Sequence, residues 1–317
     1  MAVRHVISIA ELGADNLSEM VDLALQVASS GLNKAPTLKG KVVGIYFRGT
    51  STRTRTAFSV GAMKLGANII AYGPNDLQIV TGETAPDTAR VLSGFLDALV
   101  MRTNQSVEEM RAMAGQERMS IINAMSDNEH PTQAITDLVT LKEEFGHLKD
   151  IHVLYVGEGN NTASALSLAV ALTPGMQLTL VTPEGYGLPK DALDKAQDLA
   201  RQNGALIEEH HRIDGLPKGV DAVYATRWQT MGMPKADPNW LEIFEPFKVT
   251  QQMMAEVSKP SGTIFMHDLP AVRGGDVDDE VLDGPQSRSF RQAFHKMTSA
   301  MSILEWCVAS RARTVAP

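Results

Sequence analysis

The fold is decided by residues 47–55, Phe-Arg-Gly-Thr-Ser-Thr-Arg-Thr-Arg. An apolar run typical of a buried strand, residues 41–47, leads into it, and residues 56–64 predict a helix after it. A helix N-terminus offers unpaired N–H groups and partial positive charge, and arginine adds a fork of donors that matches phosphate oxygens. We therefore expect a phosphate to be bound here; the alternative is a capped helix with solvated arginines. The expected phosphate ligands are Ser51, Thr52, Arg53 and Thr54.

The composition narrows the class of protein. A chain of 317 residues is long enough for two ordinary domains. Its net charge of −8 argues against a nucleic-acid binder, which needs a basic face. Cys307 is the only cysteine, so no intrachain disulfide forms, as is common in reducing compartments. We expect a cytoplasmic protein without a membrane partner, because no signal core is seen and the apolar run 163–172 is too short to span a bilayer.

Strand-like and helix-like runs alternate along the chain, which indicates parallel strands with helices on both faces. The alternation pauses at the polar residues 146–150, a candidate domain boundary, and then restarts. Two stretches, 75–83 and 227–246, are predicted to be irregular. The predicted strands are 42–47, 67–71, 98–101, 120–124, 151–156, 177–181, 221–224 and 263–266. Helices are predicted at 16–30, from 51 to 64, and at 84–96, 106–114, 131–145, 162–172, 190–203 and 292–310.

Polar residues follow two further strands of the first half. Arg102 comes directly after the strand 98–101, and His130 precedes a helix that begins at Pro131. Gln133 is three residues beyond His130, so both side chains are able to face one ligand. Because ligands of such sheets bind beyond the carboxyl ends of the strands, we expect these residues at one site. Each one alone is also compatible with a surface charge or a helix cap.

The second half has its own motifs at strand ends. Residues 157–161, Gly-Glu-Gly-Asn-Asn, resemble the start of a dinucleotide fingerprint, but Thr162 replaces its third glycine, which disfavours a nicotinamide or flavin cofactor. The asparagines are instead suited to a carboxylate or amide of a small substrate. Residues 226–232 and 267–270 follow two more strands, although either is also compatible with ordinary loop chemistry. No group of His, Cys or carboxylates has the spacing of a metal site, so we expect no metal.

Taken together, these motifs resemble the aspartate/ornithine carbamoyltransferase family over nearly the whole chain. Residues 51–55 are similar to its carbamoyl-phosphate signature, and Arg102 and residues 130–133 to its next two elements. Other segments are more similar to ornithine than to aspartate enzymes: 76–78 with 82–84, 157–161, 228–232 and 279–287.

The departures from the family pattern concern mainly the acceptor. Asp268 stands where ornithine enzymes have Cys, and Thr226 stands where they have Asp; both family residues contact the amino end of ornithine. Arg227 and Gln229 are instead similar to residues of the aspartate enzymes that bind acceptor carboxylates. Two basic positions also differ. Lys296 replaces an arginine near the chain end, and Thr81 replaces a basic residue before Gly-Glu-Thr.

The resemblance implies an α/β protein with two doubly wound parallel-sheet domains. The carbamoyl-phosphate domain would comprise residues 1–146 joined by the C-terminal helix 292–317, and the Rossmann-like acceptor domain residues 147–291. It implies carbamoyl transfer from carbamoyl phosphate to ornithine or a related diamino acid, without a cofactor, in amino-acid metabolism such as arginine biosynthesis. The alternatives are an aspartate carbamoyltransferase or a non-catalytic relative that binds ligand.

The resemblance also assigns residues. The carbamoyl-phosphate set is Ser51, Thr52, Arg53, Thr54, Gln78, Arg102, His130 and Gln133. Within it, the catalytic residues are Arg53, Thr54, Arg102 and His130. The acceptor set is Asn161, Arg227, Gln229, Thr230, Met231, Asp268 and Leu269. Family members are trimers or multiples of trimers, so we expect a homotrimer in which Gln78 reaches the next subunit.

Overall fold

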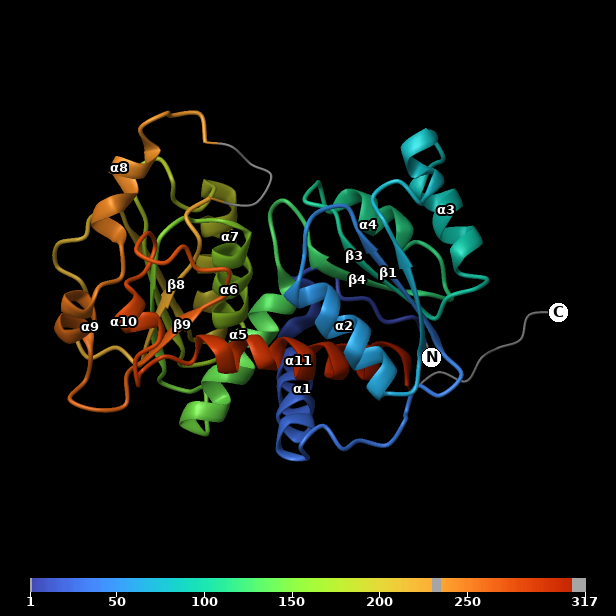
Figure 1. Ribbon diagram of the computed structural model, residues 1–317, viewed down its shortest axis with the longest axis horizontal. Coiled ribbons are helices and arrows are strands. Elements are labelled where there is room, and N and C mark those ends of the chain that lie inside the picture. The colour runs from blue at the N-terminus through green and yellow to red at the C-terminus, as the bar shows by residue number, and fades with distance from the viewer. Residues whose placement is uncertain (1, 230–234, 310–317) are drawn as a thin grey trace. The chain divides into compact units, whose positions relative to one another are not determined.

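The computed structural model describes residues 2–229 and 235–309. The chain divides into two compact units, one formed by Met1–Val139 with His295–Pro317 and the other by Thr140–Phe294 (Figure 1). The units therefore divide inside helix α5 (Pro131–Phe145), whereas we predicted a boundary after this helix, at residues 146–150.

The first unit contains a four-stranded parallel sheet in the order β2-β1-β3-β4. β3 is buried along its whole length, and the strands lie within one residue of the predicted runs at each end. β2 is an edge strand with three exposed residues. The strands are β1 Val42–Phe47, β2 Asn68–Tyr72, β3 Ala98–Arg102 and β4 Ser120–Met125.

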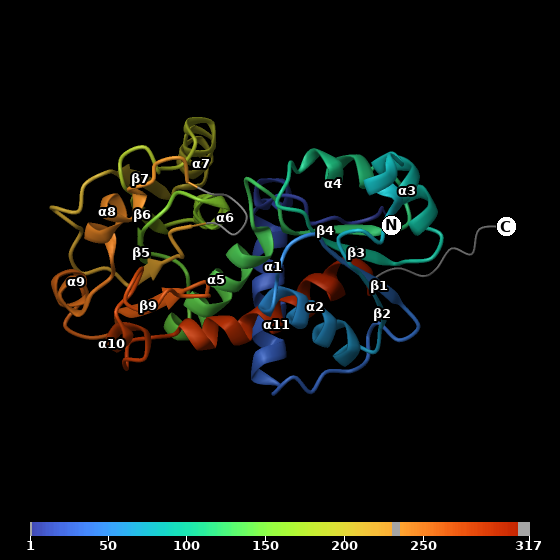
Figure 2. The ribbon, with the colours of Figure 1, turned by 45° about the horizontal axis from the view of Figure 1, so that its top comes forward.

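Helices cover both faces of this sheet (Figure 2). On one face, α3 (Ala85–Leu92) and α4 (Glu108–Met113) bury Leu92, Met110 and Met113 against β-strand residues such as Leu99. α2 packs on β1 and β2 on the opposite face. α1 begins at Ile9, whereas the predicted helix begins at residue 16. A break at Gly13, where φ is +73°, separates the first turn of α1 from the rest of the helix. The helices are α1 Ile9–Ser29, α2 Arg53–Lys64, η1 Gln78–Thr81, α3 Ala85–Leu92, α4 Glu108–Met113 and α11 Ser289–Val308, which continues into the second unit.

The second unit contains a five-stranded parallel sheet in the order β7-β6-β5-β8-β9. Its edge strand β7 was not predicted, because its sequence Leu-Ile-Glu-Glu-His has one buried residue and lacks a run of apolar side chains. The prediction that 227–246 is irregular is wrong for residues 240–246, which lie in α8 (Trp240–Phe244) and η2 (Glu245–Phe247). The elements are β5 His152–Val156, α6 Asn161–Ala171, β6 Gln177–Val181, α7 Lys190–Asn203, β7 Leu206–His210, β8 Ala222–Ala225, α8 Trp240–Phe244, η2 Glu245–Phe247, α9 Gln251–Val257, β9 Ile264–His267 and α10 Asp279–Leu282.

Each sheet has one point at which the strand order reverses. In the first unit it lies between β1 and β3, and in the second between β5 and β8. Such switch points open a crevice at the carboxyl ends of the strands, where ligands of doubly wound sheets bind. The motif at 47–55 and Arg102 flank the first switch point, and residues 157–161 and 226–229 flank the second. Over the described residues, no helix is long and apolar enough to cross a membrane.

Candidate active site

The N-terminus of α2 follows β1 by a short turn that carries Ser51 and Thr52. Thr52 is the N-cap residue, yet its φ and ψ of −80° and −58° are helical and its side chain makes no capping hydrogen bond. The simple capping alternative is therefore not observed. Ser51 Oγ instead accepts a hydrogen bond of 3.3 Å from Arg102 Nη1, and Thr54 is buried one residue inside the helix. The Thr52 hydroxyl at this helix start therefore has no capping partner and suits a ligand.

Arg102 ends β3 and is only 5% exposed. Its Cα pairs with that of Phe47, the last residue of β1, so the two strands end at the same level. The backbone N–H of Arg48 donates to the Arg102 carbonyl at 2.9 Å, which holds the start of the phosphate motif against this strand end. The pairing of adjacent parallel strands thus brings Arg102 and Ser51 together across 51 positions of sequence.

His130 lies immediately before α5 and is buried, with Nδ1 3.3 Å from the hydroxyl of Thr132. Burial lowers the pKa of His130 well below its ordinary range, and the positive charges of Lys296 and Arg102 lower it further. The imidazole is therefore neutral near pH 7. It keeps one N–H donor and one acceptor nitrogen, and the donor suits a carbonyl oxygen.

Gln133 is held at both ends of its amide. Its Nε2 donates to Asp137 Oδ1 at 2.7 Å, and its Oε1 accepts from Lys296 Nζ of α11. Lys296, which sequence comparison marked only as a departure, is 9% exposed and is part of this cluster. The remaining donor candidate, Gln78, is exposed on η1, where its Oε1 accepts from the Thr81 hydroxyl at 2.7 Å.

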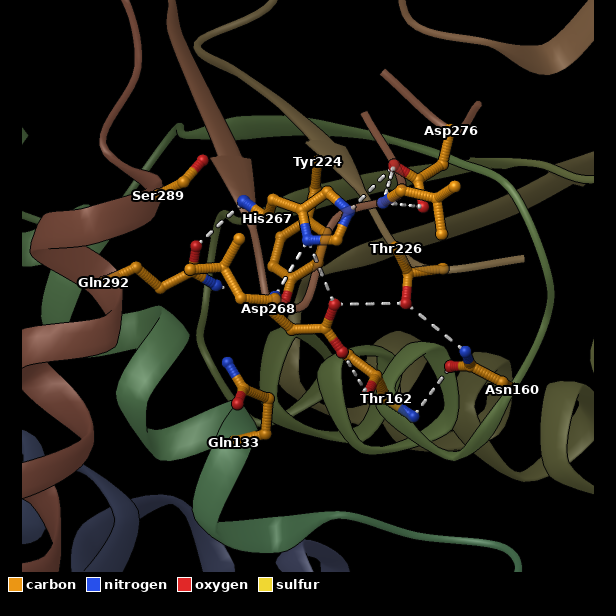
Figure 3. Close-up of polar contacts among 12 residues, drawn as sticks. Gln133, Asn160, Thr162, Tyr224, Thr226, His267, Asp268, Asp276, Ser289 and Gln292 are labelled. Atoms are coloured by element: carbon orange, nitrogen blue, oxygen red, sulfur yellow. Dashed lines mark hydrogen bonds and ion pairs between the residues drawn. The ribbon is translucent and has the colours of Figure 1, made fainter. Parts of the chain in front are cut away.

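In the second unit, Asp268 follows β9 and is held by two hydroxyl groups, one from the start of α6 and one directly after β8 (Figure 3). Thr162 donates to Oδ2 at 3.1 Å, and Thr226 donates to Oδ1 at 3.2 Å. The Thr226 oxygen accepts in turn from Asn160 Nδ2 at 3.3 Å. Asn160 Oδ1 caps α6 by accepting from the backbone amides of Thr162 and Ala163. A continuous hydrogen-bond chain therefore runs from the start of α6 to the Asp268 carboxylate.

His267 does not neutralise Asp268, although its Nδ1 lies 3.5 Å from Asp268 Oδ1. Nδ1 accepts a hydrogen bond of 2.8 Å from the backbone N–H of Leu269, so that nitrogen carries no proton. The imidazole is completely buried, and its Nε2 faces Asp276 Oδ1 at 3.5 Å. Within residues 2–229 and 235–309, no lysine or arginine forms an ion pair with Asp268, whose side chain is 17% exposed.

The other described acceptor candidates are close neighbours in sequence of these residues. Asn161 is the first residue of α6 and is buried, whereas Arg227 and Gln229 are half-buried just after β8. Leu269 is partly buried against the core of this unit and has a φ of +55°. Thr230 and Met231 lie outside the described residues.

Sequence reasoning missed the role of Thr162. It was noted only as the residue that breaks the glycine fingerprint, but its hydroxyl is one of two that hold Asp268. The signal was present, because a hydroxyl at the start of a helix beside a strand end points into the same crevice as the motif.

The described residues contain no group of three or more His, Cys, Asp or Glu arranged to hold a metal ion.

Comparison with known proteins is consistent with this geometry. Residues 4–143 match the model of the aspartate/ornithine carbamoyltransferase carbamoyl-P binding domain, and residues 149–307 match that of the Asp/Orn binding domain. An ornithine carbamoyltransferase of Caldicellulosiruptor saccharolyticus is 38% identical over 95% of this chain and 97% of its own length. An ornithine carbamoyltransferase of Methanothermobacter thermautotrophicus is 35% identical over 96% of this chain and 98% of its own length.

Similarity extends to solved structures. The ornithine carbamoyltransferase from Pyrococcus furiosus superposes with a TM-score of 0.90 and 31% identity, covering 98% of this chain and 99% of that chain. Family models match both halves of the chain, and both units have the parallel sheets and strand-end motifs described above. The chain therefore belongs to the aspartate/ornithine carbamoyltransferase family.

Proposed function

We propose that this carbamoyltransferase moves the carbamoyl group of carbamoyl phosphate to a side-chain amine of ornithine or a related diamino acid. The amine attacks the carbonyl carbon, phosphate leaves, and a ureido product of the citrulline type forms. The observation that carries the acceptor class is Asp268, a carboxylate held by two hydroxyl donors and paired with no lysine or arginine in the described residues. A carboxylate that accepts hydrogen bonds from neutral hydroxyls but has no cationic partner suits a cationic ligand.

The donor substrate is assigned to the first unit. Ser51, Thr52, Arg53 and Thr54 bind the phosphate, where the start of α2 supplies amides, hydroxyls and a guanidinium. Support comes from the absence of a side-chain cap at Thr52, which leaves its hydroxyl for the ligand. This arrangement stabilises the negative charge that grows on the departing phosphate.

The carbonyl group of the donor is assigned to Thr54, Arg102 and His130. Charge develops on the carbonyl oxygen as the amine attacks, and donors fixed before the reaction stabilise it. Because the pKa of His130 is lowered, the imidazole donates a hydrogen bond without requiring protonation. Gln133 holds the carbamoyl amino group, and Lys296 and Asp137 fix its amide plane.

The acceptor is assigned to the second unit. Asp268 binds the ammonium of the acceptor and is placed to take the proton that must leave before the amine attacks. Leu269, Thr230 and Met231 complete the contacts to the acceptor side chain. Asn161, Arg227 and Gln229 bind its carboxylate. Support for Arg227 is that, in the described part of the chain, its half-buried guanidinium makes no hydrogen bond or ion pair.

Arg227 and Gln229 also favour a second candidate function. In an aspartate carbamoyltransferase they would bind the additional carboxylate of the acceptor. Asp268 weighs against this reading, since a second carboxylate beside it would be repelled.

The assembly and the compartment are proposed on separate grounds. We infer a homotrimer or a multiple of trimers in which Gln78 reaches the neighbouring subunit. Five large apolar side chains of the first unit are exposed and would be available to an interface: Met63, Ile70, Val80, Val91 and Phe95. We also infer a cytoplasmic enzyme of amino-acid metabolism, with arginine biosynthesis the pathway that an ornithine acceptor indicates. The buried free thiol of Cys307 is compatible with that compartment.

A panel of amines incubated with carbamoyl phosphate tests the proposal. Phosphate release is expected with ornithine or a close diamino acid and not with aspartate. Turnover with aspartate alone would favour the second candidate. No turnover on any amine would indicate a non-catalytic relative.

Asp268→Asn tests the acceptor assignment within the same assay. The amide retains the size and one oxygen but loses the charge, so KM for the cationic acceptor should rise about 10- to 100-fold, the scale of one charged hydrogen bond. KM for carbamoyl phosphate should not change. Asp191→Asn, an exposed position on α7 in the same unit, is the matched control. An unchanged acceptor KM in Asp268→Asn would remove this residue from the acceptor site.

A further inference from the structure

Lys235 is a buried cation enclosed by aromatic rings. Its side chain is 5% exposed and forms an ion pair with Glu158. The Nζ atom lies 4.7 Å from the ring centroids of Tyr186 and Phe244 and 5.4 Å from that of Trp240. We call these five residues the Lys235 cage.

Burial of this kind needs a reason. Lysine is almost never buried without a partner, because desolvation of the ammonium is costly. The ring faces and the carboxylate offset that cost, since both interact strongly with a cation that is shielded from water. Removal of the carboxylate or of the rings would leave the Lys235 charge uncompensated. Removal of the ammonium would leave the carboxylate and the rings without their cation.

The Lys235 cage joins loops that follow three different strands at the carboxyl edge of the sheet. Glu158 lies in the turn between β5 and α6, and Tyr186 lies in the loop between β6 and α7. The Gly159 amide donates to the Tyr186 carbonyl at 2.8 Å. A Cβ on Gly159 would lie 2.3 Å from the backbone of Gly187 and Leu188, so only glycine permits this approach of the two loops.

The cage also contacts the segment that follows β8. The ring of Phe244 packs against that of Trp228, with centroids 5.6 Å apart. Trp228 is buried and lies between Arg227 and Gln229. On the other side, Glu158 is only two residues from Asn160 and three from Asn161. Lys235 therefore connects to the motif at residues 157–161 through Glu158. It connects to the motif that contains Trp228 through the ring of Phe244.

We propose that Lys235 is a positioning residue for the acceptor half, which holds the β5–α6 turn and residues 226–229 in one arrangement. This inference rests on the proposed function, which makes Asn161, Arg227 and Gln229 acceptor ligands. The effect passes through Glu158 to the asparagines and through Phe244 to Trp228. Phe244 and Trp228 are buried core residues of this unit, so the tests below keep both rings and change only the charged partners Lys235 and Glu158.

Lys235→Met tests this role, because methionine fills similar space without the charge. We expect KM for the amine acceptor to rise about tenfold, with KM for carbamoyl phosphate and kcat changed by less than about twofold. Lys235→Arg should restore most of the acceptor KM, since arginine also pairs with a carboxylate and stacks on aromatic rings. Lys190→Met is the matched control, since Lys190 pairs with Asp194 on an exposed face of α7.

Glu158→Gln provides a second test that keeps the size of the side chain. It should raise the acceptor KM in the same direction, even if Lys235→Met lowers the yield of folded protein. A purely structural role predicts a different result, in which both variants lower the unfolding midpoint while acceptor KM stays at the wild-type value. That result would overturn the inference, as would equal increases in both KM values.

The wild-type enzyme separates failure of this inference from failure of the proposed function. If the wild type carbamoylates no amine, the proposed function is contradicted and this inference with it. If the wild type turns over normally and Lys235→Met has an unchanged acceptor KM, only the inference is overturned.

Discussion

A few polar side chains at strand ends define both halves of the candidate site, and their partners come from distant parts of the chain. Arg102, His130 and Gln133 were selected from their positions after predicted strands together with the family resemblance, and their ligand contacts stay a prediction. Their partners were not predictable in this way. The Lys296 bond to Gln133 spans 163 residues, and the pairing of Lys235 with Glu158 spans 77. Such contacts depend on tertiary packing, which hydrophobic periodicity does not specify.

Arg53→Ala tests the donor half at the scale of one residue. Loss of a guanidinium that binds phosphate should weaken carbamoyl-phosphate binding about 10- to 100-fold, as expected for one charge-assisted hydrogen-bonding group. Titration calorimetry with carbamoyl phosphate measures this change. Arg118→Ala, on an exposed loop of the same unit, should bind normally. Wild-type affinity in Arg53→Ala would show that the phosphate lies elsewhere.

The lowered pKa of His130 has a consequence for stability. In the unfolded chain His130 takes up a proton below about pH 6.5, whereas the folded protein keeps it neutral to lower pH. The unfolded state therefore binds more protons in this window, and stability due to His130 is lost as pH falls below about 6.5.

Urea unfolding of the wild type and of His130→Gln at about pH 7.5 and 5.5 measures this contribution. The wild type should lose more unfolding free energy between the two pH values than the variant, because the other titrating groups are common to both. Equal losses would mean that folded His130 binds protons as an ordinary exposed histidine does.

At the scale of elements, the sequence predicted the strands that carry apolar runs to within about one residue and missed elements with few buried residues. α5 and α7 begin and end at the predicted residues, because their apolar spacing and flanking residues are clear. β7 and α8 are five residues each, and neither has the apolar pattern of a core element. Their conformations are set by sheet pairing and by packing of aromatic rings, so single-sequence patterns do not reveal them.

A variant at the start of α2 distinguishes phosphate binding by Thr52 from capping of the helix by the same side chain. Thr52 makes no side-chain cap, so Thr52→Ala should change unfolding free energy by less than about 0.5 kcal/mol while weakening carbamoyl-phosphate binding. Thr250 does cap α9, its hydroxyl accepting from the Met253 amide at 3.1 Å. Thr250→Ala should therefore cost about 1 kcal/mol of stability without affecting binding. Denaturant titrations with calorimetry distinguish the two; a stability loss in Thr52→Ala equal to that in Thr250→Ala would support the capping alternative.

At the scale of the molecule, the prediction of two parallel-sheet units was confirmed. The contacts between subunits are a different matter, because the pattern of a single sequence does not specify how copies of the chain associate. The proposed trimer therefore needs its own test. Ile70 lies on the edge strand β2 and is 42% exposed. Ile70→Lys should shift the sedimenting species from trimer toward monomer, since an interface disfavours an unpaired charge. Leu241→Lys, at an exposed apolar position of the second unit, should leave the trimer intact. A monomeric wild type would contradict the assembly.

The central claim is that one protein couples carbamoyl phosphate to a cationic amine by transfer rather than hydrolysis. The most direct measurement follows ¹³C-labelled carbamoyl phosphate with ornithine by NMR, alongside phosphate release. We predict that the label appears in a ureido carbon in a one-to-one ratio with phosphate, and that Asp268→Asn slows both together. Phosphate released without a labelled ureido product, or labelled product formed only with aspartate, would contradict the account.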